Sequence, residues 1–144
     1  YQTAENALET ILKTVTGYSA ANVSKGDYRM LGTGNMKAMV LNPGPFIREN
    51  LSPGIVNTGW VILLELYIAF QGEISSIASS IRTERQAVID KIDQYPTLNR
   101  TSGITLGVLE AGDEPELGAR GSMKYWRQVM RVRVREAGTV TYAE

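Results

Sequence analysis

The chain has 144 residues, and its fifteen basic and fifteen acidic side chains give a formal net charge of zero. It contains no cysteine and no histidine, which excludes disulfides, thiolate metal sites and the commonest general base. We therefore expect no enzyme activity, no cofactor and no metal site. No apolar run reaches the roughly 18 residues of a membrane helix, so a soluble chain without a membrane partner is expected. The length predicts one domain, residues 1–144.

The first segment predicts an amphipathic helix that begins with Thr3 as its N-cap and stops at Gly17. Its apolar residues recur at helical spacing, which is typical of a helix that covers a sheet. These residues are Ala4, Ala7, Leu8, Ile11, Leu12 and Val15. The glycines of Gly32–Asn35 are typical of turns, because no phosphate-loop motif accompanies them.

A short strand is predicted over Met36–Leu41, where apolar and other residues alternate. The sequence Asn42-Pro-Gly-Pro45 is expected to end this strand, since proline and glycine punctuate secondary structure. Residues 42–57 are then expected to form a long exposed loop. Loops of this length in a compact domain are commonly functional, so Phe46 and Arg48 are candidate contacts to a partner protein.

The segment Thr58–Phe70 predicts a long strand, because its alternate residues are apolar from Trp60 onward. That parity is expected to be buried, while Glu65 and Tyr67 lie on the other side of the strand. After Gly72 the apolar period changes to that of a helix. This second helix is expected to end near Tyr95, because Pro96 follows it.

Two further segments follow the second helix. Ile104–Leu109 predicts a strand with Ile104, Leu106 and Val108 on one face. Residues 110–122 carry four carboxylates, several glycines and a proline, and are expected to form a long mobile loop. Four charged residues of this loop are candidate partner contacts. They are Asp113, Glu114, Glu116 and Arg120.

The last clear element is a predicted strand over Tyr125–Glu136, and the tail Thr139–Tyr142 is expected to pair with a sheet edge. On the strand, Trp126, Met130, Val132 and Val134 share one face, and a set of arginines occupies the other. That set is Arg127, Arg131, Arg133 and Arg135. Acidic residues therefore gather just before basic ones, and a neutral composition conceals a local separation of charge.

Together these segments predict an α+β fold in the order helix, strand, strand, helix, strand, strand. A mostly antiparallel sheet of about four strands would bury one face under both helices. The uncovered face would carry Glu65, Tyr67 and the arginines of Tyr125–Glu136, which favours a role in binding or assembly.

This arrangement resembles the tail terminator and neck (head–tail joining) proteins of long-tailed bacteriophages. The opening helix and the segment from Gly26-Asp-Tyr28 to Asn42-Pro-Gly44 carry the first part of the resemblance. Trp60–Phe70 leading into Glu73–Tyr95, and an acidic Gly/Pro segment before Tyr125–Glu136, carry the rest. The likeness lies in architecture and pattern over most of the chain.

The resemblance implies a structural virion protein that forms a hexameric ring, caps the tail tube and ends its polymerisation. It implies that the chain assembles in the host cytoplasm and resides in the tail or neck of the virion. The implied partners are other copies of the chain, the tail tube protein and a head-completion or neck protein, with DNA passing through the channel without sequence-specific binding. Arg131, Arg133 and Arg135 would face a neighbouring subunit or the channel, and residues 42–57 and 112–121 would grip tube or neck proteins.

Three alternatives remain at this stage. A head-completion or tail-completion factor has similar size and patterning. A nucleic-acid-binding module would use the arginine face with Tyr67 and Tyr125, although no RNP-like aromatic motif is present. An enzyme is disfavoured, because Ser79 and Ser80 belong to no nucleophile elbow and no histidine base exists.

Overall fold

Two long strands form the centre of the sheet. β3 (Ile55–Phe70) and β6 (Met123–Thr139) pair antiparallel with no register shift, from Ile55 opposite Thr139 to Phe70 opposite Lys124. The computed structural model describes residues 1–28, 36–121 and 123–140, apart from the side chain of Arg120.

Four more strands complete a six-stranded mixed sheet in the order β1-β2-β3-β6-β4, with β5 also paired to β6. They are β1 (Val23–Lys25), β2 (Lys37–Ser52), β4 (Ile104–Gly112) and β5 (Glu116–Arg120). The predicted α+β class is confirmed, but the predicted four-stranded sheet and element order are wrong in detail. β1 and β5 were not expected as strands, and β1 runs parallel to β2.

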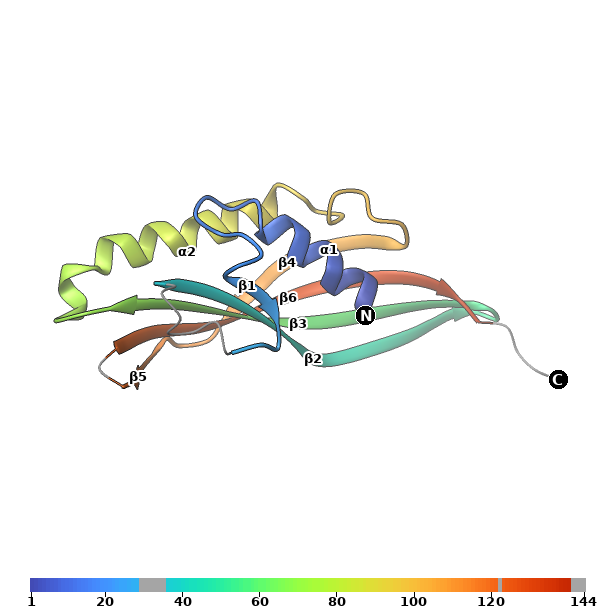
Figure 1. Cartoon of the computed structure of the whole chain (residues 1–144). Helices are drawn as coiled ribbons and strands as arrows, with labels where there is room; N and C mark the ends of the chain where they lie inside the picture. The colour runs from blue at the N-terminus through green and yellow to red at the C-terminus, as the bar shows by residue number, and fades with distance from the viewer. Residues whose placement is uncertain (29–35, 122, 141–144) are drawn as a thin grey trace.

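Both α-helices cover the same face of the sheet, as expected (Figure 1). They are α1 (Gln2–Leu12) and α2 (Ala78–Asp93), and a short 3₁₀ turn, η1 (Ile74–Ser76), precedes α2. α1 begins at Gln2 with Tyr1 at the N-cap, so Thr3 lies within the helix and is not its cap. α2 stops three residues before Pro96, which lacks the amide hydrogen that a helix needs.

The core lies between the helices and the predicted parity of β3. Ile62, Leu64 and Leu66 are fully buried, and Ile68 and Phe70 are nearly so. They meet apolar side chains of both helices and of β6. These are Ala4, Leu8, Ile11 and Leu12 of α1, Ile81, Val88 and Ile92 of α2, and Trp126, Met130, Val132 and Val134 of β6. The periodicities therefore identified the buried face of each of these elements.

The segment 42–57 is a β-hairpin and not the predicted loop. β2 continues past Asn42-Pro-Gly-Pro45 to Ser52 and turns directly into β3. A strand tolerates proline at a bulge or on an unpaired edge, and both conditions hold here. The register shifts between Pro43 and Phe46, and β1 pairs with β2 only as far as Leu41.

The segment 110–122 is mostly strand as well. β4 and β5 both pair with β6, with Gly112 opposite Met130 and Glu116 opposite Arg127. Between these two pairs, the break between β4 and β5 contains residues 113–115, whereas β6 contains only residues 128 and 129. The break, where Pro115 lies, therefore accommodates one extra residue. Glu110, Asp113 and Glu116 each form an ion pair with an arginine of β6, and the predicted long loop is wrong.

A register shift also divides β4. Ile104 lies opposite Glu136 and Leu106 opposite Arg135, so one residue of β4 is passed over between them. Ile104 is consequently buried on the helix side, whereas Leu106 and Val108 lie on the side of the arginines. The prediction that these three residues share a face is wrong, because strict alternation fails at a bulge.

Two predicted features, the Gly32–Asn35 turns and the tail beyond Val140, lie outside the described residues. Thr139 itself extends β6, and the Val140 amide donates to the Gly54 carbonyl at 3.0 Å. Within residues 1–28, 36–121 and 123–140, no helix has the length and apolar character needed to cross a bilayer.

Adjacent leucines of β3 provide a test of the two faces. Leu64 is fully buried under the helices, whereas Leu63 is half-buried on the other face. We expect Leu64→Ala to lower the free energy of unfolding by about 2–5 kcal/mol, because it leaves a cavity in the core. Leu63→Ala is the matched control, and its loss should be about half as large or less. Denaturant unfolding of both variants measures this, and equal losses would contradict the assignment of faces.

Candidate functional site

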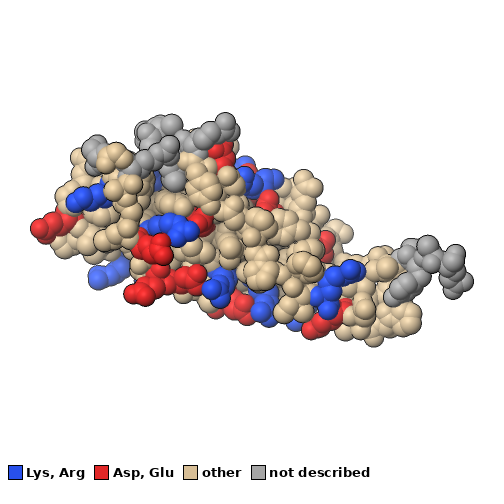
Figure 2. Space-filling view, turned by 90° about the horizontal axis from the view of Figure 1, so that it is seen from below, with Lys and Arg blue, Asp and Glu red and all other residues tan. Residues whose placement is uncertain are grey.

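The sheet face opposite the helices is here called the open face. The register places Tyr67 opposite Arg127, Leu63 opposite Arg131 and Val61 opposite Arg133, all on this face. Seen from below, acidic and basic side chains are intermingled along it, and neither sign dominates (Figure 2). The predicted shared face of Glu65, Tyr67 and the arginines is therefore formed.

Glu65 is buried on this face, with only 5% of the residue exposed. Its carboxylate accepts hydrogen bonds from the guanidinium of Arg127 and the hydroxyl of Tyr28. The Asn42 side-chain amide donates to it as well, at 2.8 Å, and also to the Tyr28 hydroxyl at 2.6 Å. A buried carboxylate needs several donors of this kind to offset the cost of its desolvation.

Tyr67 joins this cluster to the surrounding aromatic rings. Its hydroxyl accepts a hydrogen bond from Nε of Arg127 at 3.1 Å. Its ring meets those of Tyr28 and Tyr125 edge-on, with centroids 6.3 and 6.5 Å apart. Edge-to-face pairs at this separation are favourable. The region around Glu65 is thus a closed structural cluster within one chain, and Glu65 itself offers very little accessible surface to a partner.

The cluster also shifts the pKa values of its members. Burial raises the pKa of Tyr28 to about 12, and its hydrogen bond to the Glu65 carboxylate adds to the effect. Burial acts to lower the pKa of Arg127, but its hydrogen bonds to Glu65 and Tyr67 outweigh burial and raise it. Tyr28 is a neutral donor and Arg127 a cation at neutral pH, as their ordinary pKa values already require, and both shifts extend these states to higher pH.

Two other arginines of the open face form ion pairs with the adjacent strand segment of the same chain. Arg131 lies 3.0 Å from Asp113, and Arg133 lies 3.2 Å from Glu110. Arg127 makes a second pair with Glu116 at 3.2 Å. The separation of charge along the sequence is therefore largely neutralised inside the fold. Arg135 makes no ion pair with any described residue.

Beyond the helices, β2, β3 and β6 extend as a projection here called the arm, residues 46–60 and 134–139, and β4 flanks only its base, where Ile104 lies opposite Glu136. The rings of Tyr1 and Trp60 meet edge-on at 5.6 Å, and this contact marks the limit of helical cover. The strands β2, β3 and β6 continue past α1 in Figure 1. Four large apolar side chains of the arm are 48–60% exposed. They are Phe46, Ile47, Leu51 and Ile55.

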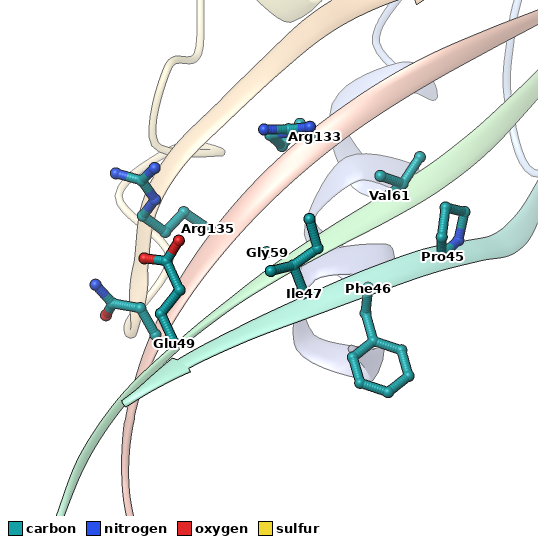
Figure 3. Close-up of a pocket in the computed structure, with 9 residues that line it drawn as sticks. Pro45, Phe46, Ile47, Glu49, Gly59, Val61, Arg133 and Arg135 are labelled. Atoms are coloured by element: carbon teal, nitrogen blue, oxygen red, sulfur yellow. The ribbon is translucent and has the colours of Figure 1, made fainter. Parts of the chain in front are cut away.

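A shallow groove of about 150 Å³ runs along the open face at the base of the arm. Figure 3 shows Ile47 and Val61 from neighbouring strands beside Arg133 and Arg135 of β6. Its apolar floor and charged border are typical of a surface that binds protein.

The predicted partner-contact residues lie on two separate parts of the sheet. Phe46 and Arg48 lie exposed on the arm, in β2 and not in a loop. Asp113 and Glu114 occupy the break between β4 and β5, and Glu116 lies in β5, where it pairs with Arg127. Arg120 belongs to the backbone of β5, and its side chain lies outside the described residues.

Sequence reasoning missed the donors that close over Glu65. The sequence predicts that Asn42 ends a strand and assigns Tyr28 to no helix or strand, so neither residue is expected on the open face. The signal that was available is Glu65 itself, which shares its parity with the apolar residues Val61 and Leu63, because a carboxylate buried among such residues requires donors. The exposed apolar residues Ile47, Leu51 and Ile55 were also missed, since that segment was predicted to be a loop.

Among residues 1–28, 36–121 and 123–140, no group of three or more acidic side chains is placed to hold a metal ion. No protein-family model matches the chain, and a search of curated proteins finds no significant match.

Replacement of the buried carboxylate tests the role of the cluster. We expect Glu65→Gln to lower the free energy of unfolding by about 1–3 kcal/mol, because hydrogen bonds to a charged group are lost and the Arg127 charge is left half-paired. Glu116→Gln is the control: its side chain is 72% exposed, so a change below about 0.5 kcal/mol is expected. Chemical denaturation compares the two, and a negligible effect of Glu65→Gln would contradict a stabilising cluster.

Tyr28 makes the stability of the cluster depend on pH. Its folded-state pKa is raised from 10.0 to about 12, so its contribution is fully present below about pH 10 and is lost as pH rises towards about 12. We expect Tyr28→Phe to be less stable than the parent protein at neutral pH and to lose less stability between pH 10 and 12. Melting temperatures measured across this range test the idea, and parallel pH profiles for the two proteins would refute it.

Proposed function

We propose that this chain is a structural tail terminator of a long-tailed bacteriophage. In this role, copies of the chain form a ring that caps the tail tube, ends its polymerisation and joins the tail to the neck. The observation that carries the proposal is the arm. It exposes four large apolar side chains on an extension of the sheet, and apolar surface of this kind commonly marks a site of protein association.

The shape and electrostatics of the chain also support a role in assembly. The molecule is elongated along β3 and β6, and the arm gives its two ends different surfaces (Figure 1). A subunit with two different ends is suited to the head-to-tail contacts that build rings.

The internal ion pairs count against the nucleic-acid alternative. Arg127, Arg131 and Arg133 already contact carboxylates of their own chain. A phosphate backbone would have to displace these carboxylates, and the chain has no net positive charge to attract it. The neck alternative, a head-completion or tail-completion factor, would share the same assembly surfaces and differs in the protein that is bound.

Assembly with the tail tube protein tests the proposal. Native mass spectrometry should give a species of six times the 15.8 kDa chain mass, and electron microscopy should show rings at tube ends. Tubes polymerised in the presence of the protein should be shorter than tubes polymerised without it. A strict monomer that never binds or shortens tubes would refute the proposal.

Two further outcomes separate the alternatives. Binding to a head-completion protein but not to tubes would favour another neck role. Salt-sensitive binding to duplex DNA at moderate ionic strength would favour the nucleic-acid module.

A further inference from the structure

The end of the sheet opposite the arm contains a hollow, here called the end hollow, of about 690 Å³. Phe70, Ile74 and Leu117 contribute apolar surface to it from three separate elements. Leu117 is 62% exposed, the largest exposed fraction among the large apolar side chains described. A Cβ atom added to either Gly72 or Gly118 would meet nothing within 4 Å, so the hollow is open to an incoming group.

The arm and the end hollow are too far apart to meet within one chain. β3 begins at Ile55 in the arm and ends at Phe70 in the hollow. Its sixteen residues span about 50 Å at the rise of an extended strand. One surface projects and the other is recessed, and both are apolar, so two copies of the chain present complementary shapes to each other.

Charged residues at the two surfaces are complementary as well. Arg48 and Glu49 are exposed on the arm, and neither makes an ion pair with a described residue. The end hollow is lined by Glu73 and Lys124, which likewise have no ion-pair partner among the described residues. The arm thus has two unpaired cations, Arg48 and Arg135, and the unpaired anion Glu49, and the end hollow has one unpaired charge of each sign. Opposite charges of the two surfaces can therefore pair, and complementary charges set the register of an interface.

We propose that the arm of one copy binds in the end hollow of the next copy. This inference rests on the proposed ring and identifies the interface that would build it. A contact between two different surfaces repeats head to tail from one copy to the next. The copies close into a ring when the rotation between neighbouring copies permits it. The occupant is a second copy because one polypeptide carries both complementary surfaces.

Paired variants test this arrangement. Ile47→Asp places a charge on the arm, and Leu117→Asp places one in the hollow. Both positions are exposed in the single chain, so folding should be retained, and circular dichroism checks this. Thr10→Asp, on the exposed surface of α1, is the control for an added carboxylate. Native mass spectrometry should show at least a tenfold loss of assembled species for each of the two variants and none for the control.

A mixture of the two variants gives the sharper result. The Leu117→Asp variant keeps an intact arm, and the Ile47→Asp variant keeps an intact end hollow, so these two surfaces can bind each other. The arm of Ile47→Asp and the end hollow of Leu117→Asp each carry the added charge and are blocked. We therefore expect a dimer of twice the 15.8 kDa chain mass and no larger species. As a second measurement, Glu49→Lys and Lys124→Glu should each weaken assembly at low salt, and their combination in one chain should restore it.

The outcomes distinguish this interface from the proposed function. If both aspartate variants retain the mass of the parent assembly, the arm does not bind in the hollow, while the proposed ring stands. If Leu117→Asp alone still dimerises, arm meets arm and the head-to-tail arrangement is overturned. If the parent chain remains a monomer at every concentration and on tail tubes, both proposals fail.

Discussion

The uninterrupted pairing of β3 with β6 is the constraint on which the rest of the structure depends. Sixteen residues of each strand extend the sheet over about 50 Å. An α-helix rises only 1.5 Å per residue, so the sixteen residues of α2 span about 24 Å and the eleven of α1 about 17 Å. The helices therefore cover one face of the sheet from the end near Phe70 as far as Tyr1, and they leave the arm without cover (Figure 1). The exposed apolar surface follows from this difference in length.

Most charged groups of the open face around Glu65 are engaged by partners within the chain. Glu65 is closed off by Tyr28 and Asn42, and the arginines of β6 meet acidic residues of β4, β5 and the break between them. Partly exposed pairs of this kind stabilise little, but they fix the register of neighbouring strands. With these charges satisfied inside the chain, the two ends of the sheet present the unpaired groups and the exposed apolar side chains. Assembly through the arm and the end hollow is consistent with this distribution of paired and unpaired groups.

The sequence was sufficient where periodicity reports burial directly. The parity of Trp60–Phe70 and the face of Trp126–Val134 follow from alternation, and both helices follow from their apolar stripes. The sequence was insufficient at bulges and sheet edges. There, Pro43 and Pro45 lie within strand β2, and Pro115 lies between strands β4 and β5. The sequence also could not show that distant carboxylates meet the arginines of β6, because that depends on the pairing of β4 and β5 with β6. The arm was missed because Asn42-Pro-Gly-Pro45 predicts the end of a strand, whereas β2 continues through a bulge there to Ser52.

Covalent trapping tests the central claim that the two ends of neighbouring copies meet. The chain has no native cysteine, so a chain carrying both Ile47→Cys and Leu117→Cys can be treated with a short bismaleimide and analysed by denaturing mass spectrometry. We expect a ladder of multiples of the chain mass from the double variant and no multimers from either single variant. Dimers formed by Ile47→Cys alone, or no ladder from the double variant in its assembled state, would contradict the claim.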